Sequence, residues 1–241
     1  ISISKSGEKL NTNYLVSFEK FQTDGISAMT HNEEKDAYRN NSFLGKFDNQ
    51  LNDYLEIEGS VRLRDTYLQY DKVIDTATAT HNEEENGRHY LASGALTYKP
   101  NKKFSNKLSL TSSYTKRSYG AAAGSGNVIK DNYYGERYSY GYTGNYNFNL
   151  DNSLIFGVER EEDQIGYNKD LTGIKRESYY TTSSFFDYQK RISNNLFATY
   201  GTRFDDNSVA GDEESHRATL AYLFDDKKSK IKSSFGTGFR Y

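Results

Sequence analysis

The stretch YLEIEGSVRLR (Tyr54–Arg64) decides the fold, because its apolar and polar residues alternate one by one. Every second position is apolar or glycine: Leu55, Ile57, Gly59, Val61 and Leu63. The positions between them are charged or polar: Glu56, Glu58, Ser60, Arg62 and Arg64. Successive side chains of a strand point to opposite faces, so the stretch predicts a β-strand with one apolar and one polar face.

Segments of the same kind recur along the whole chain. They lie near residues 1–6, 12–23, 37–50, 54–70, 88–99, 107–119, 134–149, 153–167, 178–190, 195–206, 215–224 and 230–241. Many exceed the roughly 5–6 residues that are usual for strands of soluble sheets. Such lengths are typical of tilted strands that cross a bilayer.

The connections between these segments alternate between short and long. The short ones fall near 7–11, 51–53, 101–106, 150–152, 192–194 and 225–229, and the long ones near 25–36, 71–87, 120–133, 168–177 and 207–214. Short periplasmic turns and long extracellular loops produce this alternation in outer-membrane barrels. We therefore expect an all-β, antiparallel transmembrane β-barrel segment of about twelve meander strands. A soluble β-sandwich is the alternative fold.

Composition narrows the possible functions. The chain has 241 residues with 22 Tyr, 14 Phe, one Pro and no Cys, and a net charge of −2. It has no run of roughly 18 apolar residues, so a membrane helix is excluded. The balanced charge predicts no nucleic-acid partner. Without Cys there is no disulfide or thiolate chemistry, and no catalytic motif is present, so we expect no enzyme activity.

Three segments near the C-terminus have a recognisable pattern: GTRFDDNS (Gly201–Ser208), SHRATLAY (Ser215–Tyr222) and SSFGTGFRY (Ser233–Tyr241). They resemble TonB-dependent outer-membrane receptors, most closely the vitamin B12 (cobalamin) transporter branch. Near the start, Thr23–Gly25 followed by Asp36–Ser42 resembles an early hairpin of the same barrels.

This resemblance implies a barrel of about 22 strands around a plug. Residues 1–241 would then be one domain, the central part of that barrel, without the plug and without the box that contacts TonB. The implied function is import of cobalamin or a metal chelate such as a siderophore, energised through TonB. The implied partners are the TonB complex, the plug, the ligand, and the lipid and lipopolysaccharide of a Gram-negative outer membrane.

Two alternatives remain open. Ser234, Gly236, Phe239 and Tyr241 also fit a C-terminal insertion signal, which is typical of a complete passive channel of about twelve strands. A soluble or surface-exposed β-sheet adhesion module is the third interpretation.

The long connection 71–87 is the candidate metal site. It contains five carboxylates, of which Asp71, Asp75 and Glu85 are the predicted ligands. Clustered loop carboxylates can supply the six to eight oxygens that Ca²⁺ takes. In the cobalamin receptors, acidic residues of early extracellular loops bind calcium, and Asp71 is the best match to them. No cofactor is required, and a negatively charged surface loop is the alternative.

Tyrosines cluster at the predicted outer strand ends. Tyr70, Tyr119, Tyr134 and Tyr167 are the predicted substrate contacts, because their amphipathic rings can grip a bulky ligand. An interfacial girdle that anchors the barrel in the membrane is the alternative role. The charged face, which includes Glu159 and Arg203, is expected to line the lumen, where it would contact a plug or water.

Overall fold

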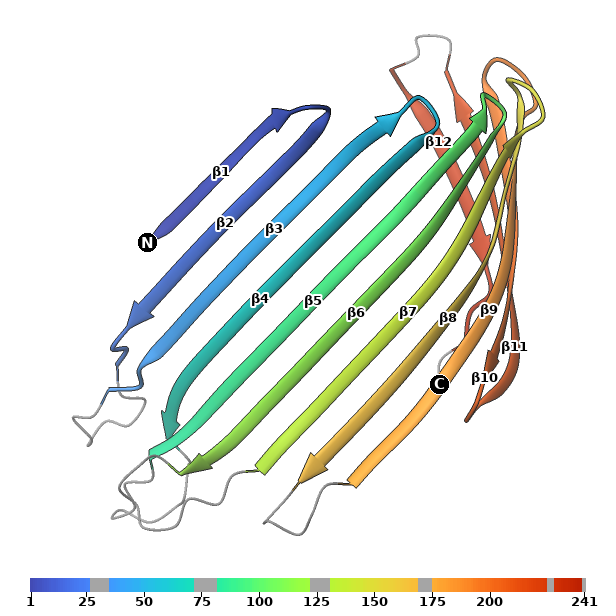
Figure 1. Cartoon of the computed structure of the whole chain (residues 1–241). Helices are drawn as coiled ribbons and strands as arrows, with labels where there is room; N and C mark the ends of the chain where they lie inside the picture. Colours follow the sequence, from blue (N-terminus) through green and yellow to red (C-terminus); the bar gives the residue numbers. More distant parts are fainter. Residues whose placement is uncertain (27–34, 72–81, 122–130, 169–174, 225–227, 240–241) are drawn as a thin grey trace.

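The computed structural model (Figure 1) describes the chain except for residues 27–34, 72–81, 122–130, 169–174, 225–227 and 240–241. The described residues form one sheet of twelve antiparallel strands in chain order, which confirms the predicted meander. In chain order the strands are β1 (Ser2–Lys9), β2 (Thr12–Thr23), β3 (Tyr38–Asn52), β4 (Leu55–Asp71), β5 (Asn82–Asn101), β6 (Phe104–Ala121), β7 (Asp131–Asn147), β8 (Asn152–Asn168), β9 (Lys175–Arg191), β10 (Leu196–Asn207), β11 (Gly211–Leu223) and β12 (Lys230–Gly236).

Strand pairing continues each face of one strand into the next strand. Val61 of β4 lies opposite Ala92 of β5 on the apolar face, and Arg64 of β4 lies opposite His89 on the polar face. On the apolar face, the Leu, Ile and Val residues of β4 continue into Leu96 of β5 and Leu108 of β6. The two-faced pattern of Tyr54–Arg64 therefore extends across the sheet, as the sequence predicts.

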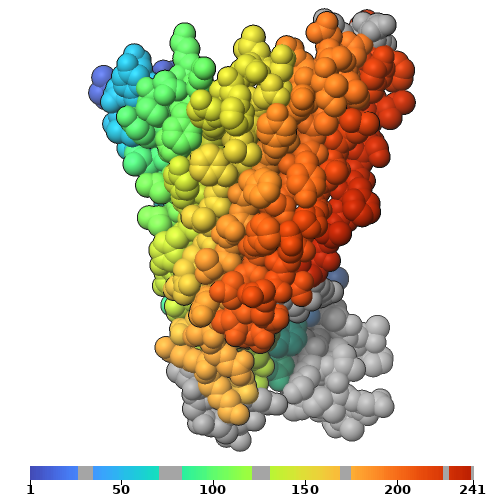
Figure 2. All heavy atoms as spheres, turned by 90° about the vertical axis from the view of Figure 1, so that its right-hand side faces the viewer, coloured from blue at the N-terminus to red at the C-terminus, as the bar shows by residue number. Residues whose placement is uncertain are grey.

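The sheet is a single curved layer (Figure 1). The exposure of its side chains indicates that the polar face is the concave one. Among the described residues no hydrophobic side chain is buried. Leu110 on the apolar face is 58% exposed, whereas Ser183 and Asp205 on the polar face are 2% and 6% exposed. Curvature crowds side chains on the concave side and spreads them on the convex side. The uncovered apolar face is thus the outer surface of the wall, which Figure 2 shows in part over the later strands.

Cross-strand pairs of glycine with an aromatic residue recur in the wall. Phe156 of β8 lies opposite Gly144 of β7, and Phe47 of β3 lies opposite Gly59 of β4. A Cβ at Gly144 would lie 2.5 Å from the Phe156 ring, and a Cβ at Gly59 would lie 2.6 Å from the Phe47 ring. Each ring therefore lies across its glycine, which explains why glycine occurs inside these strands.

The apolar side chains of the convex face form a band, and this apolar band crosses the strands obliquely. In β4 the band ends at Leu63. Following the residue that lies directly opposite on each successive strand, from Leu63 through β5, β6 and β7, one reaches Gln164 in β8. In β8, however, the last apolar residue on this face is Val158, several residues closer to the short turns. Figure 1 shows that the strands are tilted. An apolar band that stays at one level relative to a membrane must then end at different positions along successive strands. In the described part of the chain, no helix is long and apolar enough to cross a membrane.

The first short turn, predicted at residues 7–11, is tighter than expected. Leu10 and Asn11 alone connect β1 to β2, and both have positive φ values, 50° and 59°. Two positive φ values in succession define a type I′ hairpin turn, whose twist matches that of the flanking strands.

One predicted long loop is wrong. Residues 207–214 are mostly strand, and only Ser208–Ala210 connect β10 to β11. The Asn207 side chain accepts hydrogen bonds from the Val209 and Ala210 backbone N–H groups, both at 2.9 Å, and Gly211 has φ 85°. This local network closes a tight turn, so the acidic residues that follow it are paired in β11.

Strand β5 begins at Asn82, earlier than the predicted residue 88. Its first residues pair with the end of β4, up to Asp71 opposite Asn82. The acidic run in β5 is therefore part of the hairpin and not of the loop.

Candidate functional site

The concave face carries three groups of polar side chains, which we name the inner pocket, the central network and the outer ledge. The charged residues that the sequence placed on the lumen side all lie on this face. They are Glu56, Glu58, Arg62, Arg64, Glu159 and Arg203.

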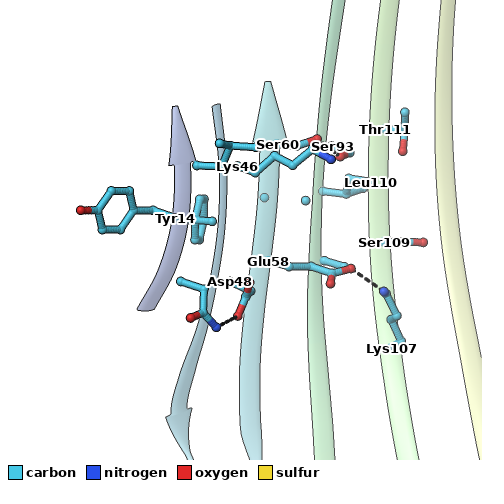
Figure 3. A pocket seen from close by; sticks show the side chains of 16 residues that line it. Tyr14, Lys46, Asp48, Glu58, Ser60, Ser93, Lys107, Ser109, Leu110 and Thr111 are labelled. Atoms are coloured by element: carbon cyan, nitrogen blue, oxygen red, sulfur yellow. Dashed lines mark hydrogen bonds and ion pairs between the residues drawn. The ribbon is translucent and has the colours of Figure 1, made fainter. Parts of the chain in front are cut away.

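The inner pocket lies near the short turns and is shown in Figure 3. It is an open cavity of about 540 Å³ over β2 to β6. Asn13 donates a hydrogen bond of 2.8 Å to Asp48, and Lys107 forms an ion pair with Glu58. Asp48 and Glu58 are direct cross-strand neighbours, so two carboxylates face each other here. The amide and the ammonium offset a repulsion that such a like-charged pair otherwise suffers.

The central network surrounds Arg203 of β10. Its guanidinium donates to Glu159 at 2.9 Å, to Asp205 at 2.9 Å and to the Ser183 hydroxyl at 2.7 Å. Three neighbouring strands are thus joined by one side chain. Next to it, Arg217 forms an ion pair of 2.7 Å with Asp187. These contacts make this part of the concave face a connected polar network over β8 to β11.

The outer ledge lies at the opposite end of the wall, beside the long connections. Tyr119 of β6 and Tyr133 of β7 contact each other with ring centroids 5.7 Å apart. Arg117 lies 5.7 Å from the centre of the Tyr119 ring and forms an ion pair of 2.8 Å with Glu85.

The ledge continues along the same face into β8 and β9. Tyr167 lies opposite Tyr133, and the Lys175 ammonium lies 5.9 Å from the centre of the Tyr167 ring. Aromatic rings beside cations form a surface that suits a planar or bulky anionic ligand.

The predicted substrate contacts divide between the two faces. Tyr70, Tyr119 and Tyr167 lie on the concave face, where they border the ledge. Tyr134 lies on the convex face, opposite Lys116, whose ammonium is 5.3 Å from the ring centre. In this position Tyr134 fits the girdle role that the sequence left open. Ligand binding by any of the four remains a prediction.

The predicted calcium ligands are only partly within the described residues. Asp75 lies outside them, as does the side chain of Asp71, and Glu85 is paired with Arg117. Among the described side chains, no three carboxylates or histidines come together as a metal site. Calcium at this loop therefore stays a prediction.

Sequence reasoning missed several residues of these clusters. Arg117, Lys175, Asp48 and Lys107 gain their roles from cross-strand partners. The signal for these residues is a charge on the polar face that lies opposite an acidic residue or a tyrosine of the next strand. This signal can be recognised only when the register between the strands is known.

Comparison with known structures identifies the fold. The chain superposes on the RagAB peptide transporter with a TM-score of 0.76 at 13% identity, covering 98% of this chain and 36% of that one. It matches the outer membrane transporter YddB from Escherichia coli with a TM-score of 0.78 at 11% identity, covering 98% and 37%. For the ferric citrate transporter FecA the TM-score is 0.70 at 14% identity, covering 98% and 40%.

The wall therefore has the fold of part of an outer-membrane transporter barrel, and it spans less than half the length of these relatives. No protein-family model matches the sequence, and no curated protein matches it.

Proposed function

We propose that this chain forms part of the barrel wall of a TonB-dependent importer in the outer membrane of a Gram-negative bacterium. The observation that carries the proposal is the curved sheet with an uncovered apolar convex face and a charged concave face. An apolar band facing lipid and a polar lumen are the requirements of a transmembrane barrel. The wall has transport and binding roles and no catalytic one.

The substrate we propose is a bulky nutrient, either cobalamin or a metal chelate such as a siderophore. Cobalamin rests on the sequence resemblance of the chain ends. A chelate is favoured by the outer ledge, where Arg117 and Lys175 accompany three tyrosine rings. The ledge lies on the side of the long connections, where an extracellular ligand would arrive first. Calcium in the 71–87 connection would order this entrance.

The proposed role of the central network and the inner pocket is to contact a plug inside the lumen. Arg203 and Lys107 hold charged groups on the concave surface, where a plug would meet them. The TonB complex would act on that plug and not on the wall.

Binding and uptake by cells that produce the intact protein test this proposal. Labelled cyanocobalamin and a ferric catecholate are the two probes. We expect Tyr119→Ala to weaken binding of the true ligand about fivefold or more, the scale of one lost aromatic contact. Tyr134→Ala, on the convex face, is the matched control and should leave binding unchanged.

Energy dependence separates the importer from the passive channel. An importer of this class loses uptake, but not binding, when the membrane potential is collapsed or TonB is removed. Uptake that continues at the same rate would contradict the proposal and favour the channel.

A further inference from the structure

The convex face contains a groove that the import function does not use. It has a volume of about 620 Å³ and lies over β5 to β9. Its walls are apolar and include Leu96, Leu110, Tyr140 and Val158. Val158 remains 52% exposed, so no other side chain of the described protein fills the groove.

Among the described residues that line this groove, Arg160 is the one basic residue, and it lies at the outer end. Arg160 follows Val158 on the same face of β8 and lies just beyond the apolar band. Its guanidinium lies 4.2 Å from the centre of the Tyr180 ring and donates to the Thr182 hydroxyl at 3.2 Å. These two contacts hold the guanidinium just beyond the apolar residues, where the headgroups of a surrounding bilayer would lie.

The charge of Arg160 remains accessible. Its ion pair with Glu162, at 2.8 Å, is exposed, with side chains 44% and 46% accessible. Exposed pairs of this kind contribute little free energy, so a phosphate can replace or join Glu162 at small cost.

We propose that the groove and Arg160 together bind one membrane lipid whose phosphate headgroup has a net negative charge. The acyl chain lies along Leu96, Leu110 and Val158, and the phosphate accepts hydrogen bonds from the Arg160 guanidinium. The fold identifies the occupant, because the convex face meets lipid and the cation selects an anionic headgroup. This site depends on the membrane location of the wall and not on which solute is imported.

Native mass spectrometry of the intact protein tests this site. The protein, in neutral detergent, is supplied with equal amounts of phosphatidylglycerol and phosphatidylcholine that carry the same acyl chains. We expect bound phosphatidylglycerol to exceed phosphatidylcholine about fivefold, the effect of one basic residue near an anionic headgroup. Arg160→Gln should bring the ratio close to one.

Two further variants separate the parts of the site. Arg62→Gln removes an equal charge from the concave face and should keep the fivefold ratio. Leu110→Trp fills the groove and should lower the amount of both bound lipids while keeping their ratio. The heat-dependent gel mobility of each variant shows whether it is folded.

An unchanged ratio in Arg160→Gln, or an equal loss in Arg62→Gln, would overturn the headgroup assignment. Full lipid binding by folded Leu110→Trp would overturn the groove. A protein that stays folded in water without detergent and binds neither lipid would refute this site and the membrane location together. Loss of the lipid preference alone leaves the import function standing.

Discussion

Replacing Gly144 by alanine should test the packing of the wall directly. The new Cβ would lie 2.5, 2.8 and 2.9 Å from three carbon atoms of the Phe156 ring, well below ordinary contact distance. The ring must therefore move by about 1 Å or leave its rotamer. Its neighbours oppose this, because Phe104 is stacked on Phe156 at 6.4 Å and Tyr142 meets it edge-on at 6.3 Å.

The expected destabilisation follows from three contributions. Overpacking costs about 1–3 kcal/mol. Disturbed aromatic contacts add about 0.5–1.5 kcal/mol. Alanine loses less backbone entropy on folding than glycine, which stabilises the folded state by about 0.5–1 kcal/mol. Gly144→Ala should therefore lower the free energy of unfolding by about 2 kcal/mol, between limits of about 0.5 and 4 kcal/mol.

Urea unfolding of the intact protein in detergent micelles, followed by tyrosine fluorescence, measures this change. Gly135 of the same strand is the matched control, because a Cβ there meets nothing within 4 Å. Gly135→Ala should be neutral or slightly stabilising. In a Phe156→Ala background, Gly144→Ala should lose its effect. Equal shifts for the two alanine variants, or no rescue by Phe156→Ala, would refute the reasoning.

Three further predictions concern other parts of the wall. Arg203→Met leaves Glu159 and Asp205 without their cation and should lower the free energy of unfolding by about 2–3 kcal/mol in the same assay. The loss is smaller than for a fully buried pair because the Arg203 side chain is 38% exposed. An effect no larger than that of Arg62→Met would contradict this. Leu10→Gly should stabilise the protein by about 0.5–1 kcal/mol, because glycine adopts φ 50° without strain; a lower urea midpoint would show that the turn differs. Chelation of calcium should weaken ligand binding to cells, and a variant with Asn at positions 71 and 75 should be insensitive to the chelator; equal sensitivity would exclude this loop as the site.

Much of the fold could be predicted because the alternation is a local property. Tyr54–Arg64 identifies both faces of β4 without knowledge of its neighbours, and the structure keeps those faces. The limits of the strands were less predictable. The acids of β11 suggested a loop, but Asp206 and Asp212 pair across a turn that Asn207 closes.

The clusters on the concave face were harder to predict, because they depend on register. Arg203 and Glu159 are 44 residues apart in sequence and meet only when three strands are aligned. Tyr133 and Tyr134 are adjacent in sequence yet lie on opposite faces, so an error of one residue moves a tyrosine from the concave face to the convex face. Next to a long loop, side-chain alternation alone does not determine which of two adjacent residues lies on the concave face.

The meander topology has a consequence for how such walls evolve. Within the described residues, every strand contacts only the strands before and after it in the chain. A gene duplication that inserts one hairpin would therefore disturb a single pair of neighbours and leave the other hydrogen-bond ladders intact. Insertion of one strand alone would reverse the direction of everything downstream and move the turns to the side of the loops. Growth by hairpins rather than by strands accordingly preserves the orientation of the whole wall, and it accounts for the even strand numbers of barrels built in this way.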